Sequence, residues 1–398
     1  MDDSKYSERK DFEWAVKLNR MGLNLLGIWP NPKENPREKL MSNIRALFTF
    51  LVMITVLVPC LHSLIKVHSD VMLIIDNLQI TLPILSTVIR LPIFWWKKKA
   101  FTSIINMIVE DWLKSKNIHE RQTMVKWALR ARIFITCSYI MIAIGLITLF
   151  VIPIFGKSMT LTPNITDSGR SLTLPTYYIY DVTKRPQYEF TIISQWISTT
   201  TTGILYIGID NFFGLLVFHI CGQLSIMRNR LKHSHENFRV VLRANVMYHI
   251  RLLRAINTIE DTYNVILLIL FLYFGIMFVF CGFLLVTLVG EGETNVSFTR
   301  LSIPFMIIMS IFIHMGIYCA VNETLMAECN KIYHEVYECE WYSLDPKEAK
   351  DLIPFMIKVS DPVYFTAGKI FPVTMAMLCN LIKTSAGYVS VLLTARKN

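Results

Sequence analysis

Seven long apolar segments divide this 398-residue chain and limit what it can fold into. Each has at least the roughly 20 residues that a helix needs to cross a hydrocarbon core about 30 Å thick. Lipid leaves unpaired backbone polar groups unsatisfied, so each segment is expected to be a helix. The sequence therefore predicts an all-α, polytopic membrane protein with seven transmembrane helices, at Asn43–Ile65, Val71–Trp96, Ile133–Phe155, Thr191–Ile220, Val265–Val289, Leu301–Val321 and Phe365–Thr394.

Charged residues lie mainly between these spans. The chain is 53% hydrophobic and only 18% charged, with a formal net charge of +10. The basic residues are spread over several loops instead of one domain, which argues against a nucleic acid partner and favours loops that face an anionic leaflet of the lipid bilayer. Residues 1–42 contain no apolar signal-peptide core, so we expect the first span to direct insertion.

The loops alternate between many and few basic residues. The segment before the first span and the loops after the second, fourth and sixth spans are rich in Lys and Arg, whereas the intervening loops carry few. Because Lys and Arg accumulate in cytoplasmic loops, the amino terminus is predicted to be cytoplasmic and the carboxyl terminus extracellular. This orientation is opposite to that of G-protein-coupled receptors.

Glycosylation sequons provide an independent check on this orientation. Asn164 begins an Asn-Ile-Thr sequon and Asn295 an Asn-Val-Ser sequon, and both fall in loops predicted to be extracellular. A third match at Asn322 falls at a cytoplasmic helix end and is interpreted as a chance match. We therefore predict Asn164 and Asn295 as the glycosylation sites.

Two of the loops that are predicted to be cytoplasmic have sequences that favour helix formation. Residues 228–262 and 323–358 are long and charged with scattered apolar residues, so they are expected to continue as helices whose apolar stripes need a partner, within this chain or in a neighbouring one. Four regions follow from the pattern: a cytoplasmic segment with an interfacial helix (1–42), a six-helix region with extended cytoplasmic helices (43–322), an anchor helix and oligomer contact (323–364), and the seventh helix (365–398).

The last span departs most from plain hydrophobicity. Several of its residues recur every three or four positions and so share one helical face, namely Asn380, Lys383, Thr384, Gly387, Val391 and Thr394. Asn and Lys are costly in lipid and at such depth face protein or water. Two interpretations stay open: a helix packed tightly in a bundle through small residues, or the wall of a water-filled pore built from several copies.

Other polar groups inside the spans are isolated. Asp76, Gln79, Gln195, Asp210 and His314 each interrupt apolar sequence, and a structural hydrogen bond is the common role of such a group. The chain shows no phosphate-binding loop, nucleophile elbow or zinc-protease motif, so we expect neither an enzyme nor a cofactor or metal site. The eight cysteines lack the spacing of a metal site or a disulfide framework.

The carboxyl end resembles the insect odorant receptor family. That family has a long cytoplasmic approach with a Trp, a Pro before an Ala-Gly pair, and a final helix rich in Ser and Tyr. The matching positions here are Glu323, Tyr333, Tyr337, Trp341, Pro362, Ala367, Gly368, Phe371 and the run 383–393, with 26–30 at the other end. The family's co-receptor carries a long insertion in the fourth loop, which is missing here, so the chain resembles an odorant-tuning receptor.

The resemblance implies an odorant-gated, non-selective cation channel of four subunits, including the co-receptor. In such channels the final helix lines the central pore. The hydrophobic constriction of the family would fall on Val391 and Ala395, with Thr394 at a polar pore position, so the resemblance favours the pore interpretation. Large apolar side chains are usual at the constriction, and Ala395 departs from that pattern. The plasma membrane of olfactory neuron dendrites is the implied location.

The resemblance also implies a pocket for a small volatile odorant in the outer half of the bundle. The positions that it suggests belong to the second, third, fourth and sixth spans and are Ile75, Gln79, Ile142, Gly145, Leu149, Trp196, Thr199, Thr200, Phe305 and Met309. A transporter is the alternative class, and a G-protein-coupled chemoreceptor a more remote one.

Overall fold

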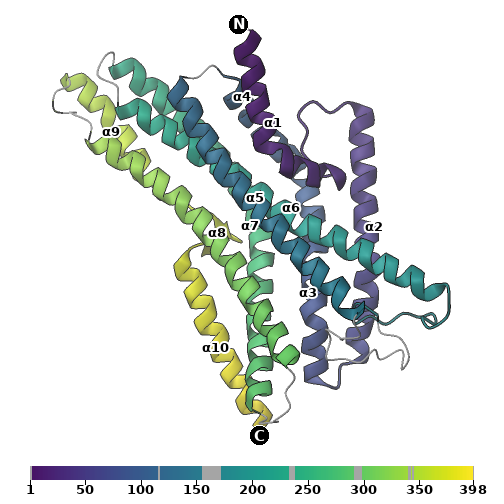
Figure 1. The fold of residues 1–398 in the computed structure, drawn as a ribbon. Coiled ribbons are helices and arrows are strands. Elements are labelled where there is room, and N and C mark those ends of the chain that lie inside the picture. The colour runs from purple at the N-terminus through teal and green to yellow at the C-terminus, as the bar shows by residue number, and fades with distance from the viewer. Residues whose placement is uncertain are drawn as a thin grey trace.

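A computed structural model describes residues 2–114, 117–154, 172–232, 238–290, 298–338, 342 and 345–397. Helices account for nearly all regular structure in these residues (Figure 1). In chain order the elements are α1 (Asp2–Leu25), α2 (Pro36–Lys66), α3 (Val71–Trp96), α4 (Lys98–Leu113), α5 (Ile118–Ile154), α6 (Gln187–Lys232), α7 (Phe238–Gly290), α8 (Phe298–Glu338), α9 (Pro346–Ser360), β1 (Thr366–Ala367), β2 (Phe371–Pro372) and α10 (Met375–Lys397).

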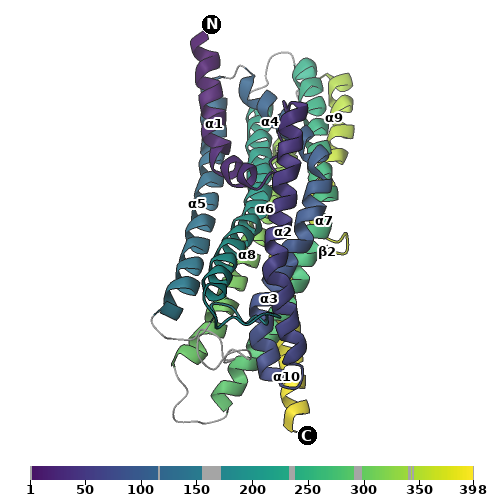
Figure 2. The same ribbon diagram turned by 90° about the vertical axis from the view of Figure 1, so that its right-hand side faces the viewer.

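Seven of these helices are long and apolar enough to cross a membrane, which confirms the predicted all-α, seven-span architecture. They are α2, α3, α5, α6, α7, α8 and α10, and each overlaps one of the seven apolar segments. The two ends of the chain lie at opposite ends of the bundle (Figures 1 and 2). An odd number of crossings requires that arrangement.

Three helices are much longer than a bilayer is thick. α7 has 53 residues, and at 1.5 Å per residue it is about 80 Å long against a hydrocarbon core of about 30 Å. The predicted helical continuations of the fourth and sixth loops are therefore present in α6, α7 and α8. Their apolar residues Leu252, Ile256 and Val336 are buried within this chain. The role of residues 323–364 as an oligomer contact stays a prediction.

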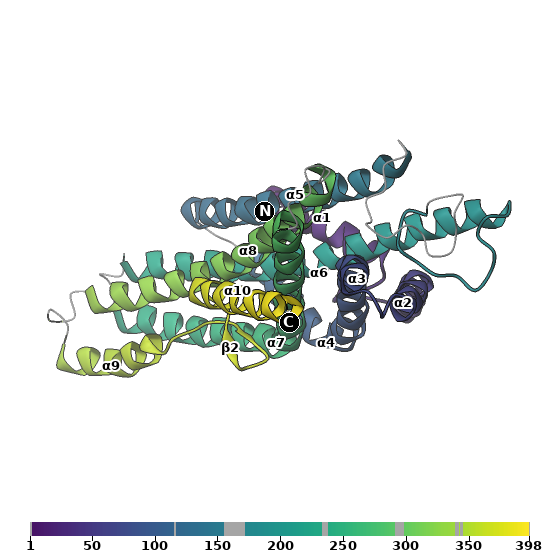
Figure 3. The same cartoon turned by 90° about the horizontal axis from the view of Figure 1, so that it is seen from below.

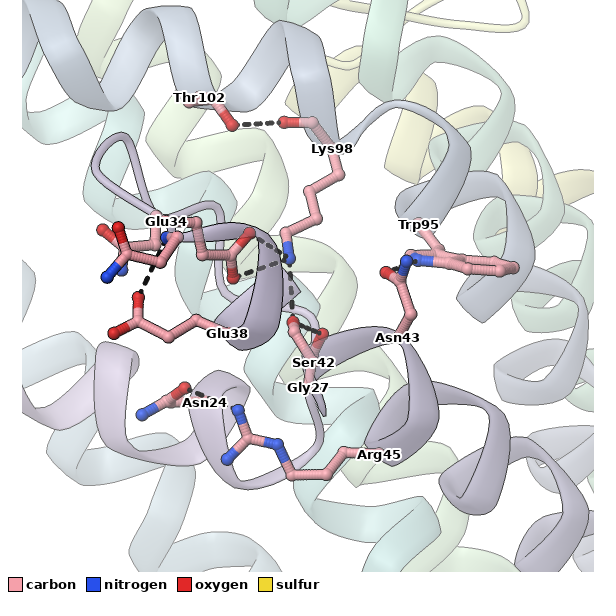
Figure 4. A network of polar contacts seen from close by, with 12 residues as sticks. Asn24, Gly27, Glu34, Glu38, Ser42, Asn43, Arg45, Trp95, Lys98 and Thr102 are labelled. Carbon is pink, nitrogen blue, oxygen red and sulfur yellow. Dashed lines mark hydrogen bonds and ion pairs between the residues drawn. The ribbon is translucent and has the colours of Figure 1, made fainter. Parts of the chain in front are cut away.

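The amino-terminal helix ends in a tight turn. Gly27 has φ +76°, and a Cβ there would lie 2.3 Å from the carbonyl oxygen of Ser42. The Gly27 and Ile28 amides donate to the carbonyls of Asn24 and Leu23, the pattern of a left-handed helix cap. Figure 4 shows how this turn is joined to α2: the Ser42 hydroxyl donates to the Gly27 carbonyl, and the Lys98 ammonium donates to the Ser42 hydroxyl.

The seventh helix starts later than the sequence predicts. Residues 365–374, assigned to the last span by their apolar character, instead form an antiparallel hairpin of β1 and β2 before α10 begins at Met375. The buried side chain of Asn322 joins both sides of this hairpin, since it accepts from the Phe365 amide (2.9 Å) and donates to the Val373 carbonyl (2.6 Å). Gly368 turns the hairpin with φ +65°.

Candidate pore face and ligand-binding region

Helix α10 has one buried face and one exposed face. Leu378, Ser385 and Val389 are buried and pack on α7 and α8. At Gly282 of α7, a Cβ would lie 3.1 Å from Val389, so this glycine permits the close approach of the two helices. Seen along the bundle, α10 lies beside α7 and α8 on the side away from α2 (Figure 3).

The predicted polar stripe lies on the opposite face of α10. At 100° per residue, positions 380, 384, 387 and 391 point about 180° away from Val389. Val391 is 65% exposed whereas Val389 is 9% exposed, and the space around the Cβ position of Gly387 is open. All six stripe residues whose side chains are described are exposed, namely Asn380, Lys383, Thr384, Gly387, Val391 and Thr394. The side chain of Ala395 lies outside the described part.

A groove of about 740 Å³ runs between α7 and α10 along one edge of this stripe. Phe280 and Leu381 supply part of its apolar lining, and Asn380, Thr384 and Tyr388 stand at its α10 edge. The stripe is thus bordered by an apolar groove on one side, and no described part of this chain covers it.

The predicted ligand residues on α5 and α6 face each other. Ile142 lies against Gly203, where a Cβ would approach it to 3.1 Å, and Trp196 stacks on Phe150 with ring centroids 5.1 Å apart. Thr199, Thr200 and Leu149 are half-buried beside them, while Gly145 is exposed with open space around its Cβ position. These residues form one continuous region along the α5–α6 interface.

The remaining predicted ligand residues lie elsewhere. Ile75 on α3 is buried in a separate cluster with Phe283 of α7 and Val389 of α10. Gln79 is buried, and its Nε2 atom has no hydrogen-bond partner within the described part of the chain. Phe305 and Met309 on α8 are exposed. The structure therefore brings together the α5 and α6 positions and places Ile75 beside α10.

Part of the third loop covers the α6 end of this region. The amide of Gln195 donates to the Thr176 hydroxyl (2.9 Å), and the Trp196 indole donates to the Thr173 hydroxyl (3.4 Å). Asn77 on α3 donates to the Pro175 carbonyl (3.3 Å). These described residues of the third loop are thus tied to α3 and α6. The sequons at Asn164 and Asn295 lie outside the described residues.

A buried charge cluster at the centre of the bundle was missed from the sequence. The guanidinium of Arg90 on α3, which is fully buried, pairs with the carboxylate of Asp210 on α6. The Tyr318 hydroxyl donates to the same carboxylate (2.5 Å), and the His314 Nε2 lies 3.0 Å from its other oxygen. Tyr206 contacts the His314 ring nitrogen (3.1 Å). Arg90, the only basic residue of the second span, was the available signal.

The charge cluster connects by aromatic packing to the hairpin that precedes α10. The Tyr318 ring packs against Phe213 with centroids 5.4 Å apart, and Phe213 packs edge-to-face on Phe365 at 5.2 Å. Phe365 is the residue whose amide is held by Asn322. The same helix, α8, carries His314 and Tyr318 of the cluster and the predicted ligand residue Met309.

A second polar network lies at the other end of α6. Asp111 on α4 accepts from Arg251 on α7 (2.8 Å) and contacts the imidazole of His219 on α6 (3.1 Å). Gln223 extends the network to Tyr248. These side chains join three helices, and no group of His, Cys, Asp and Glu in the described part of the chain has the geometry of a metal site.

Comparisons with known proteins bear on what this arrangement does. The sequence profile described as "7tm Odorant receptor" matches residues 70–386. Odorant receptor 10 of Aedes albopictus is 26% identical over 52% of this chain and 56% of its own length, and odorant receptor Or2 of Anopheles gambiae is 22% identical over 85% of this chain and 90% of its own.

A solved structure shares the fold. The insect olfactory receptor OR5 of Machilis hrabei, determined in complex with eugenol, superimposes with a TM-score of 0.80 over 98% of this chain and 99% of its own, at 16% identity. At 16% identity, this superposition shows only that the fold is shared. The family assignment comes from the sequence profile, which matches most of the chain. The chain is therefore a multi-pass membrane protein that belongs to the insect odorant receptor family, a family of ligand-gated channels and not of enzymes.

Proposed function

We propose that this chain is the odorant-binding subunit of a heterotetrameric, non-selective cation channel in the plasma membrane, with its amino terminus cytoplasmic. The exposed polar stripe of α10 is the observation that carries the proposal. Asn380 and Lys383 would be costly against acyl chains, and both are exposed, with no helix among the described residues covering them. Water enclosed by the same face of neighbouring subunits removes that cost.

The pore has a constriction and a polar ring in this proposal. Val391 supplies the apolar constriction together with Ala395, and Thr394 and Asn380 supply polar groups along the path. Lys383, Thr384 and Gly387 complete the same face. The co-receptor provides the other subunits, because this chain lacks the fourth-loop insertion that marks it.

The odorant site is proposed to lie in the outer half of the bundle, centred on Trp196, Thr199 and Ile142 where α5 meets α6. The solved relative binds eugenol, a small aromatic molecule. The mainly apolar side chains here, with threonine hydroxyls beside them, suit a similarly small volatile compound. Such a ligand opens the channel only if it binds the open state more tightly than the closed state.

Cysteine accessibility tests the pore assignment directly. The background variant Cys379→Ser removes the exposed native thiol of α10. In that background we expect Val391→Cys to react with a charged thiosulfonate reagent during odorant application and to lose current. Val389→Cys is the matched control on the buried face of the same helix and should stay unmodified. Equal reaction at both positions would contradict the pore face.

The odorant site is tested by Trp196→Ala. An aromatic contact contributes about 0.5–1.5 kcal/mol, so we expect the half-maximal odorant concentration to rise about two- to tenfold. Trp95→Ala removes a comparably exposed Trp at the carboxyl end of α3 and should leave the half-maximal odorant concentration unchanged. Unaltered dose–response curves for Trp196→Ala would refute the pocket assignment.

Recording from cells that express this chain with and without the co-receptor tests the channel itself. Odorant-evoked cation current only in the presence of both subunits supports the proposal. Saturable uptake of a solute without current would instead identify a carrier. Epitope tags at the two termini, read in intact cells, test the orientation, and an extracellular amino terminus would overturn it.

A further inference from the structure

A cavity of about 870 Å³ opens between α1, the segment that follows it and α4. Its lining is divided by chemistry. Apolar side chains form one wall, including Phe12, Trp29 and Ile105, whereas Arg9, Arg20 and Lys33 supply positive charge. A space with an apolar wall and a cationic rim suits an amphiphile better than a purely apolar or purely ionic ligand.

Two of the cations remain available for a ligand. Glu13 is the acidic residue of the lining, and both of its carboxylate oxygens accept hydrogen bonds from the Arg20 guanidinium. That pair neutralises itself. Neither Arg9 nor the Lys33 ammonium takes part in an ion pair within the described residues. The cavity therefore carries two uncompensated positive charges.

The turn that follows α1, beside the cavity, is surrounded by exposed apolar residues. Met21 and Leu25 on the last turns of α1, and Leu40 and Met41 at the start of α2, are exposed apolar residues around the same turn. Such residues are buried when a helix lies in the membrane interface. The turn itself is anchored by Lys98, whose ammonium contacts Glu34 at 3.3 Å (Figure 4).

We propose that this cavity binds the phosphorylated headgroup of an anionic phospholipid, with Arg9 and Lys33 contacting phosphate and the apolar wall covering the glycerol and first acyl carbons. The proposal rests on the orientation proposed above, which puts this end of the bundle at the cytoplasmic leaflet, where anionic lipids are concentrated. A membrane lipid is favoured over a soluble anion because the exposed apolar residues hold the mouth of the cavity beside acyl chains.

Binding is measured on the purified full-length chain in phosphatidylcholine nanodiscs, with fluorescent phosphatidylinositol 4,5-bisphosphate as the probe. The double variant Arg9→Gln/Lys33→Gln removes both free charges. Each basic residue near a membrane surface contributes about fivefold in affinity, so we expect the removal of two such residues to weaken binding about thirtyfold. Inositol 1,4,5-trisphosphate without a membrane should compete weakly.

The matched control is Lys10→Gln/Lys17→Gln. Both lysines are exposed on α1 and lie outside the cavity lining, so this variant has the same net charge as the test variant. It should bind the lipid as the native chain does. Equal losses of lipid affinity in the two double variants would overturn the site, because they would indicate a diffuse effect of surface charge. Binding of inositol trisphosphate as tightly as the lipid would show that the ligand is a soluble anion and not a membrane lipid. Neither binding measurement depends on odorant or on the co-receptor, so a result that contradicts the lipid site leaves the channel proposal unaffected.

Discussion

The bundle interior and the outer face of α10 both carry polar residues at membrane depth, but they satisfy those residues in different ways. Arg90 and Asp210 lie 120 positions apart and are paired inside the chain. The Tyr318 hydroxyl donates to the same carboxylate, and the His314 Nε2 lies 3.0 Å from its other oxygen. Asn380 and Lys383 are exposed on α10 and face away from their own subunit.

The difference separates a structural role from a functional one. A buried charge is tolerated when its partner is in place, and its removal leaves the other charge uncompensated. An exposed polar stripe on a membrane helix has no polar partners within its own chain, so these partners must come from water or from another subunit. The buried Arg90–Asp210 cluster should control the stability of this chain. The exposed stripe of α10 should affect ion conduction while leaving the stability of the chain nearly unchanged.

The largest expected effect is the loss of stability when the buried Arg90–Asp210 pair is broken. Asp210→Ala leaves the Arg90 guanidinium buried without its carboxylate and should destabilise the folded chain by about 3–5 kcal/mol. Thermal unfolding in detergent, followed by size-exclusion fluorescence, measures the loss. The double variant Arg90→Met/Asp210→Leu removes both charges and should recover most of the stability. Native-like unfolding of Asp210→Ala alone would show that the cluster is not a stability element.

The second effect concerns the hairpin that positions α10. Asn322→Ala removes hydrogen bonds to the Phe365 amide and the Val373 carbonyl, and an unsatisfied buried group costs about 1–3 kcal/mol, so we expect a loss of about 2 kcal/mol or more. Thr324→Ala abolishes the same sequon but removes only an exposed hydroxyl, and should have little effect on the unfolding temperature. Equal effects of the two variants would point to glycosylation at Asn322.

Gly387→Ala tests the exposed stripe through an expected gain in stability, in contrast to the losses expected for Asp210→Ala and Asn322→Ala. Glycine inside a helix is about 0.5–1 kcal/mol less favourable than alanine, and the added methyl meets open space in this chain, so the isolated subunit should become slightly more stable. Gly282→Ala, which faces Val389 at 3.1 Å, is the control and should not gain. A destabilised Gly387→Ala subunit, measured by the same unfolding assay, would show that this face is packed.

The smallest expected effect is on conduction. A positive charge about 10 Å from a permeating ion in water changes its energy by about 0.4 kcal/mol, so Lys383→Gln should raise single-channel cation conductance by up to about twofold. Lys347→Gln on α9 removes an exposed charge distant in sequence from the stripe and serves as the control. An identical conductance for Lys383→Gln and the native chain would place Lys383 away from the ion path.

The sequence indicated the face of α10 but not its surroundings. Residue spacing alone placed Asn380, Thr384 and Val391 on one side, and in the structure this side of α10 is exposed. Spacing did not show that the span begins at Met375, because Phe365, Ile370, Phe371 and Val373 extend the apolar pattern of the span towards the amino terminus. Their hairpin depends on hydrogen bonds from Asn322, which lies in the preceding span.

The ligand positions show the same limit. Ile142 and Trp196 reach one interface because α5 and α6 pack along much of their length. Ile75 packs instead with α7 and α10, since its direction from α3 is set by how the helices cross and not by its depth in the span.

The sequence by itself determined the number and type of the spans, because the cost of exposing backbone and charge to lipid accumulates residue by residue along a single segment. Only the tertiary structure decided that Arg90 meets Asp210 and that a hairpin precedes the last helix. Those contacts join residues far apart in the chain, and their geometry depends on the angles and distances at which whole helices pack.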